Sequence, residues 1–193
     1  MPFSTLICRG WTATRFASAR CAWLAIAVLA TESVTAEVLS EAQIKAAFLY
    51  NFTRFVEWPE EAFAAPHDPL VIGVLGESAL TEDLRSIVAG RKINGRAIVV
   101  RNVENESDAA ATQVLFVSAA GDARLGALHD SLADRAVLTV GESSAFASAG
   151  GVISFVEHAG KLRFEINTAA AARARVKVSA ELQKLATAVR SAP

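Results

Sequence analysis

Residues Leu70–Leu75 of this 193-residue chain have the sequence LVIGVL, a continuous apolar run. A run without polar alternation indicates a strand that is covered on both faces, as strands are in parallel sheets. Residues 76–78 (Gly-Glu-Ser) follow at once and place a glycine at a tight exit. Ser78 is positioned to cap a helix that extends to about residue 89. The pattern therefore predicts a strand followed directly by a helix.

The same succession continues along the chain. Further short apolar strands are predicted at residues 97–101, 113–118 and 136–140. The last of these leads into a second Gly-Glu-Ser, in which Ser143 is placed to cap a helix. The other helices are predicted at residues 41–57 (capped by Ser40 and stopped by Pro59), 121–133, 168–173 and 179–189. Alternating strands and helices of these lengths favour a mainly parallel α/β sheet.

The pattern changes near the C-terminal end. Residues 152–157 and 161–167 flank a short turn, and apolar and polar residues alternate in the second segment. Alternation indicates a strand with one solvent-exposed face (the wet face), so an antiparallel hairpin at or near a sheet edge is expected. The predicted fold is therefore α/β, with a mainly parallel sheet flanked by helices in a Rossmann-like three-layer arrangement. Residues 37–193 are expected to form a single domain.

The first 36 residues have the pattern of an export signal. Arg9, Arg15 and Arg20 form a positive region, residues 21–30 are apolar, and small residues end at Ala36. The apolar run has half of the roughly 20 residues that a membrane-spanning helix needs. We therefore expect cleavage before Glu37 and a soluble periplasmic product with no later transmembrane segment.

Removal of 36 of the 193 residues leaves 157, with 16 basic and 19 acidic side chains and a formal net charge of −3. This balance argues against a basic nucleic-acid-binding surface. Both cysteines, Cys8 and Cys21, belong to the predicted signal. The remaining chain therefore has no disulfide, no reactive thiol and no cysteine metal ligand.

Motifs for catalysis are incomplete. Neither a full GxGxxG nor a GxxxxGK[ST] phosphate loop occurs. Ser78 and Ser143 lack the glycine that follows a nucleophilic serine by two residues in a nucleophile elbow. The three histidines are far apart in the sequence and match no metal-ligand spacing. The expectation is a protein that is not an enzyme and that needs no cofactor or metal.

An aromatic and ionic cluster surrounds Trp58, the only tryptophan outside the predicted signal. Trp, Phe and Arg are enriched at the anchor positions of protein interfaces. The alternative is that Trp58 ends a helix and packs on the core. Further charges lie on the wet face of the hairpin and near residue 175. The candidate partner- or ligand-binding residues are Arg54, Phe55, Glu57, Trp58, Arg163, Glu165, Arg173 and Arg175.

Several segments resemble the YfiR family, in order and over nearly all of residues 37–193. They are KAAFLYNFTRFVEWP (45–59), IGVLG (72–76), INGRAIVV (93–100), VLFVS (114–118), VLTVG (137–141), GGVISF (150–155), RFEIN (163–167) and KVSAELQKLA (177–186). The resemblance implies a periplasmic, usually dimeric α/β domain without catalysis. It also implies a repressor that binds the periplasmic part of an inner-membrane diguanylate cyclase and so affects cyclic di-GMP and biofilm formation. An OmpA-like outer-membrane lipoprotein can draw such a repressor away, and members bind small aromatic molecules.

The sequence departs from the family pattern in one respect. Many members have cysteines before the VLFVS-type strand, where this chain has residues 111–113, Ala-Thr-Gln. Control through the protein's own thiols is therefore not expected. We expect a secreted regulator of a membrane-bound signalling protein, a diguanylate cyclase or another sensor. The alternative is a periplasmic binding protein for a small aromatic or carboxylate ligand, with Arg173 and Arg175 holding the carboxylate.

Overall fold

The structure is a computed structural model that describes residues 39–132 and 135–191. These residues all belong to one compact unit that starts at Val38. The predicted export signal, residues 1–36, lies outside the described residues.

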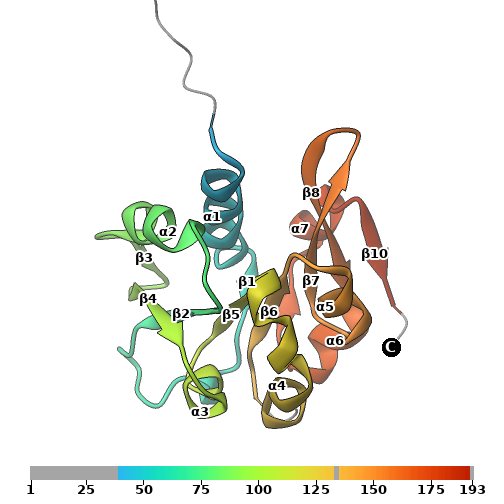
Figure 1. The fold of residues 1–193 in the computed structure, drawn as a ribbon. Coiled ribbons are helices and arrows are strands. Elements are labelled where there is room, and N and C mark those ends of the chain that lie inside the picture. Colours follow the sequence, from blue (N-terminus) through green and yellow to red (C-terminus); the bar gives the residue numbers. More distant parts are fainter. Residues whose placement is uncertain (1–38, 133–134, 192–193) are drawn as a thin grey trace, which may run out of the picture. The chain divides into compact units, whose positions relative to one another are not determined.

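An eight-stranded mixed sheet forms the centre of this unit (Figure 1). Its strands, in spatial order, are β10 (Ala188–Arg190), β8 (Lys161–Asn167), β7 (Ile153–His158), β6 (Leu138–Gly141), β5 (Val114–Val117), β2 (Leu70–Leu75), β4 (Arg96–Val103) and β3 (Lys92–Ile93). The five strands β7, β6, β5, β2 and β4 are parallel to one another. Antiparallel pairs occur between β7 and β8 and between β3 and β4. The mainly parallel sheet with an antiparallel hairpin, predicted from the sequence, is confirmed.

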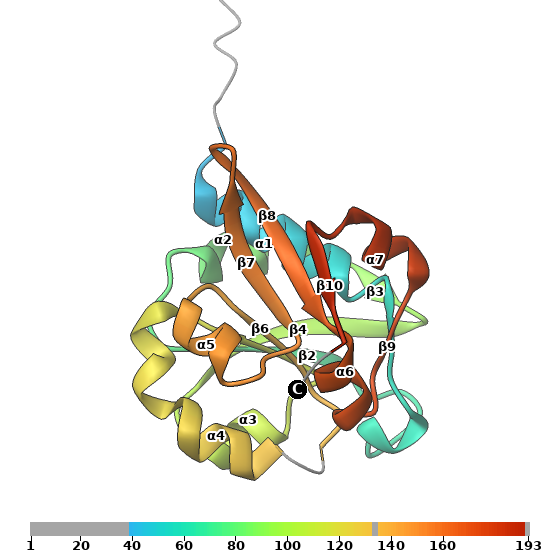
Figure 2. The same ribbon diagram turned by 90° about the vertical axis from the view of Figure 1, so that its right-hand side faces the viewer.

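Helices cover both faces of this sheet (Figure 2). They are α1 (Glu41–Phe52), α2 (Leu80–Val88), α3 (Glu106–Ala110), α4 (Leu125–Leu132), α5 (Ser144–Ser148), α6 (Thr168–Arg173) and α7 (Ala180–Leu185), with 3₁₀ turns at Glu60–Ala62 and Ala119–Arg124. Helices α1 and α2 pack on one face, and α3, α4 and α5 pack on the other. This arrangement is the predicted three-layer architecture.

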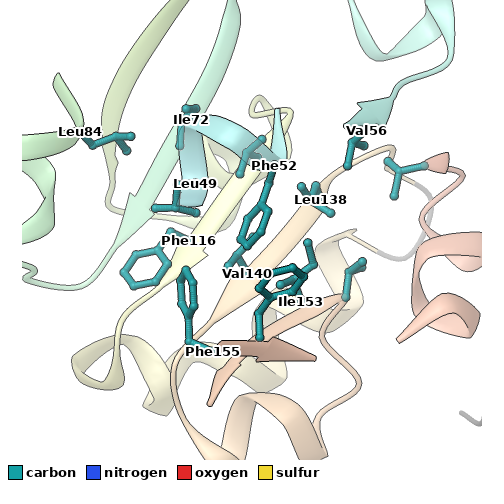
Figure 3. Close-up of a cluster of buried hydrophobic side chains, with 14 of the residues drawn as sticks. Leu49, Phe52, Val56, Ile72, Leu84, Phe116, Leu138, Val140, Ile153 and Phe155 are labelled. Carbon is teal, nitrogen blue, oxygen red and sulfur yellow. The ribbon is translucent and has the colours of Figure 1, made fainter. Parts of the chain in front are cut away.

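The buried strands send alternate side chains to the two layers of helices. In β5, Val114 and Phe116 join the core under α1 and α2, while Leu115 and Val117 join the core under α3, α4 and α5. All four are almost fully buried. Figure 3 shows Leu49 and Phe52 of α1 pointing toward Phe116 and Phe155 on the first of these faces. Burial on both sides explains why the strands have uninterrupted apolar sequences.

The first helix is shorter than predicted. It ends at Phe52, not at residue 57, and Val56–Glu57 form a short strand, β1. This strand pairs antiparallel with β9 (Lys177–Val178), which the sequence reading had missed. The helical prediction was wrong there because pairing with a distant segment overrides the local periodicity. Trp58 consequently does not end a helix.

The C-terminal prediction was also wrong in part. Helix α7 ends at Leu185, and the last described residues form β10, parallel to β8. Strand β8 therefore lies one position inside the sheet edge. Further along the chain, the predicted helix 121–133 begins as a 3₁₀ turn, and α3 lies in a segment predicted as a link.

Helix caps follow the sequence at two of the three predicted positions. The side chains of Ser40 and Ser143 accept hydrogen bonds from the backbone N–H groups of Gln43 and Phe146. Ser78 is not the cap of α2, because that position belongs to Ala79. The cap prediction for Ser78 was wrong by one residue.

Candidate functional site

The β1–β9 pair joins a segment that follows α1 to a segment that follows α6, in a small two-stranded ribbon. Val56 lies opposite Val178, and Glu57 lies opposite Lys177. Directly opposite residues in an antiparallel pair point to the same side of the ribbon. Val56 is buried, whereas Glu57 and Lys177 are both exposed. The ribbon therefore has one face on the core and one charged face in solvent.

Hydrogen bonds and apolar packing fix the ribbon on the domain. The backbone N–H of Ser179 donates to the carbonyl oxygen of Phe55 at 2.9 Å. Val56 and Val176 belong to the same hydrophobic core as α1 and α2. Phe55 and Trp58 are half-buried and pack against that core. The exposed charges on the ribbon thus project from a well-supported backbone.

Trp58 also anchors the segment that follows the ribbon. Its indole Nε1 donates to the carbonyl oxygen of Gln113 at 3.0 Å. The side chain of Gln113 is buried and accepts from the N–H of Val71 at 2.8 Å, while its amide donates to the carbonyl oxygen of Ala62 at 2.7 Å. Trp58 therefore has a structural role on its polar edge and presents only part of its ring to solvent.

Arg175 lies in a conformation that favours glycine. Its φ is +53°, in the left-handed region, at the end of α6. The N–H of Arg175 donates to the carbonyl of Ala172, and the N–H of Val176 donates to the carbonyl of Ala171. This is the Schellman pattern, in which the left-handed position is most often glycine. An arginine there places a long charged side chain beside the ribbon despite the backbone preference.

The residues on or next to β1 and β9 that reach solvent form the ribbon surface. They are Arg54, Phe55, Glu57, Trp58, Arg175 and Lys177. Five of these six were sequence candidates, and the structure brings them together. Lys177 was missed. The sequence signal for it was present, because Arg173, Arg175 and Lys177 alternate with apolar residues in RARVKV, which is typical of a strand.

Two candidates lie elsewhere, on the hairpin. Arg163 and Glu165 belong to β8 in the large sheet, not to the ribbon. Arg163 is exposed. Glu165 is half-buried and forms an ion pair with Arg190 of β10, with 2.6 Å between Oε2 and Nη2. Glu165 thus has a structural role, because its ion pair with Arg190 joins β8 to β10.

Arg173 is the last residue of α6 and lines the cavity described below, whereas Arg175, in the left-handed turn that follows, does not line it. The Nη2 of Arg173 is 3.3 Å from the position that a Cβ would take on Gly150, next to the helices α4 and α5. The two arginines that were grouped as carboxylate ligands therefore belong to separate surfaces.

Between β2 and β5, where the strand order reverses, atoms of the chain approach the carboxyl ends of the two strands closely. Folds of this kind usually bind ligands at that point, beyond the carboxyl ends of the strands. Here Ser118 Oγ donates to the carbonyl oxygen of Leu75 at 3.1 Å. A Cβ on Gly76 would lie only 2.4 Å from the same Oγ, and one on Gly121 would lie 2.9 Å from the carbonyl oxygen of Leu75. Protein atoms fill the position.

A partly buried ion pair joins α1 to the exit of β6. Lys45 Nζ lies 2.5 Å from Glu142 Oε2 and 2.7 Å from Glu41 Oε1. Glu142 Oε1 also accepts from the N–H of Ala119 at 3.0 Å. Burial lowers the pKa of Lys45, but the hydrogen bonds and negative charges of Glu142 and Glu41 outweigh it, so the pKa is raised. The second Gly-Glu-Ser segment therefore has a structural role through its glutamate.

The serine of that segment is also engaged. Ser143 Oγ accepts from the N–H of Phe146 and donates to Asp122 Oδ1, both at 2.9 Å. Over residues 39–132 and 135–191, no group of three or more His, Cys, Asp and Glu side chains could hold a metal ion. No helix in this part of the chain is long and apolar enough to cross a bilayer.

Comparison with known families gives a match over residues 42–187, to a family described as YfiR/HmsC-like. This match covers most of the chain. The chain belongs to the YfiR/HmsC-like family. The family is known for periplasmic regulators of diguanylate cyclases, which supports a general regulatory role. The family resemblance predicted from the sequence is confirmed.

Two solved structures are similar to the chain at low sequence identity. A conserved domain protein from Vibrio cholerae has 13% identity and a TM-score of 0.50, over 79% of this chain and 61% of that chain. An ABC domain from Streptococcus pneumoniae in complex with L-Trp has 13% identity and a TM-score of 0.48, over 77% and 60%. The chain thus spans about three fifths of the length of both structures. No curated protein matches the sequence.

Proposed function

We propose that this protein binds the periplasmic part of an inner-membrane diguanylate cyclase through the ribbon surface and holds the enzyme in its inactive state. The observation that carries the proposal is the family match over residues 42–187, together with a charged surface that the fold assembles from two segments far apart in the sequence. The protein acts by contact and not by catalysis.

The composition of the ribbon surface suits a protein partner. It combines half-buried aromatic rings, Phe55 and Trp58, with exposed charges of both signs. Aromatic and arginine side chains dominate the energetics of interfaces, and opposite charges fix orientation. Because the ribbon backbone is held by the core, little conformational freedom is lost on binding. A partner with complementary charges is therefore expected to dock without large rearrangement.

Repression follows if the complex favours one state of the cyclase. A bound protein shifts a conformational equilibrium only through its different affinity for the two states. The ribbon surface must therefore contact a part of the cyclase that changes between the inactive and active states. An OmpA-like lipoprotein that competes for the same residues would release the cyclase.

Export precedes this function. Residues 1–36 serve as a cleaved signal peptide in this proposal, and residues 37–193 act in the periplasm as a single domain. The protein is proposed to act as a homodimer, as the family resemblance implies. Two copies of the ribbon surface would then match the two subunits of a dimeric receptor.

Charge reversal on the ribbon tests the binding surface. Glu57→Lys is expected to weaken binding to the purified periplasmic domain of the cyclase by about tenfold or more, since like charges then meet across the interface. Arg175→Gly removes one of the three positive charges of this surface and suits the left-handed backbone, so the fold is expected to persist. Glu77→Lys is the matched control, because Glu77 is equally exposed but lies in the loop after β2. Binding by calorimetry with equal affinity for all four proteins would contradict the proposed surface.

A further inference from the structure

A cavity lies between the sheet and the helices α4, α5 and α6, on the face opposite α1 and α2. Its volume is about 180 Å³. Most of the lining is aliphatic, from strands β5 and β6 and helix α4, with a single aromatic wall. The main apolar lining residues are Leu115, Val117, Leu128, Leu132, Val137 and Phe146.

Two glycines make room for the ring of Phe146, which forms the aromatic wall of the cavity. A Cβ on Gly141 would lie 2.2 Å from Cγ of Phe146, and one on Gly151 would lie 2.0 Å from Cε1 of the same ring. No other residue would allow the ring to lie so close to the backbone on both sides. Phe146 is almost fully buried and follows the cap residue Ser143. The ring is therefore held in place and does not collapse into the cavity.

Among the described residues that line this apolar space, Arg173 is the charged one. Arg173 is exposed, and its Nη2 lies 3.3 Å from the Cβ position of Gly150, which also lines the cavity. Within residues 39–132 and 135–191, no carboxylate forms an ion pair with Arg173 and no acceptor forms a hydrogen bond with it. An arginine without an internal partner beside an apolar cavity is suited to an anionic group on a bound molecule.

We propose that this cavity binds a small monocarboxylic acid, with the carboxylate on Arg173 and the apolar part among the leucines and Phe146. A dry apolar cavity of about 150 Å³ accepts one benzene molecule. A volume of about 180 Å³ therefore accommodates an apolar body of about six to eight carbon atoms, as a ring or as a chain. Larger bicyclic or long-chain acids exceed this space.

The cavity and the ribbon surface are tested separately. The cavity contains Arg173 but none of the six residues of the ribbon surface. Ligand binding can be measured on the purified protein without a cyclase. Failure of the proposed partner therefore leaves the ligand site untouched, and failure of the ligand site leaves the partner surface untouched.

Calorimetry with two acids tests the proposal directly. Phenylacetate supplies a ring and octanoate supplies a chain, while phenylacetamide has the same shape as phenylacetate without the charge. Arg173→Gln removes the charge at an exposed position, and Arg101→Gln is the matched control at an exposed arginine outside the cavity. Ala149→Phe places a ring at an exposed lining residue and is designed to block the cavity.

The expected result is binding of at least one of the two acids. Phenylacetamide and the Arg173→Gln protein should each show about a tenfold or greater loss of affinity, the size expected for a charge-assisted pair. Arg101→Gln should bind as the original protein does. Binding of only one acid identifies the body as a ring or a chain. No binding of either acid at millimolar concentration, or equal binding by Arg173→Gln, would overturn the proposal, whether or not Ala149→Phe folds.

Discussion

The two faces of the central sheet are packed in different ways. Under α1 and α2, five phenylalanine rings form a continuous network, with centroid separations from 5.1 to 6.4 Å. They are Phe48, Phe52, Phe116, Phe155 and Phe164. Under α3, α4 and α5, Phe146 is the only phenylalanine that the described residues place in the core, and a cavity lies beside it. Aromatic rings fill the face under α1 and α2, whereas the face under α3, α4 and α5 retains a cavity. These are called the filled face and the open face.

This difference separates two roles. The filled face includes Val56 and Val176, which hold the ribbon in place. A partner surface built on this core has a rigid base. The open face has the cavity and Arg173, which we propose to bind a small ligand. Matched changes on the two faces should therefore have different effects.

The largest difference is expected from truncating one leucine on each face. Leu49 is 0% exposed and Leu128 is 3% exposed, and both belong to helices. Leu→Ala costs less where the leucine borders an existing cavity, because fewer packing contacts are lost there. Leu49→Ala should lower the free energy of unfolding by about 4 to 5 kcal/mol, and Leu128→Ala, beside an existing cavity, by about 2 to 3 kcal/mol. Chemical denaturation measures both, and equal losses would contradict the distinction between the faces.

A smaller effect is expected from adding a methyl group on the open face. In Gly151→Ala, the new Cβ would meet the ring of Phe146 at 2.0 Å. The ring must move toward the cavity, so the protein should lose about 1 to 3 kcal/mol of stability and its affinity for small carboxylates. Gly126→Ala in α4 is the control, because nothing lies within 4 Å of that Cβ. It should gain about 0.5 kcal/mol. Thermal unfolding that moves both proteins in the same direction would contradict this packing.

The smallest effect concerns the ion pair at the rim of the filled face. The pKa of Lys45 in the folded protein is raised above the ordinary value of 10.5. A raised folded pKa means that the stabilisation is complete below about 10.5 and is lost as the pH rises through the folded value. Lys45→Met should therefore lose less stability than the original protein when the pH is raised above 10.5. Denaturation midpoints below and above that pH measure the difference. Equal losses of stability in the original protein and in Lys45→Met would contradict a stabilising role of the Lys45 ion pair.

Much of the fold could be predicted because its signals are local. The run Leu70–Leu75, the alternation in β8 and the cap residues Ser40 and Ser143 each depend on neighbouring residues only. Strands β1, β9 and β10 were missed for the opposite reason. They have two or three residues each, and they exist only because a distant strand pairs with them.

The candidate residues show the same limit. Residue types indicated Arg54, Glu57 and Arg175 correctly as exposed, but their proximity depends on the register Glu57↔Lys177. The separation of Arg173 from Arg175 depends on the left-handed turn at Arg175. The cavity depends on how Phe146 packs on two glycines, which no spacing in the sequence encodes.

Repression through the ribbon surface is tested most directly by cyclic di-GMP in cells that carry the cyclase and lack this protein. Expression of the original protein is expected to lower cyclic di-GMP. Glu57→Lys, at equal periplasmic abundance, is expected to leave it high, whereas Glu77→Lys should lower it as the original protein does. Cyclic di-GMP that falls equally with Glu57→Lys, or that does not respond to the original protein, would contradict repression through the ribbon surface.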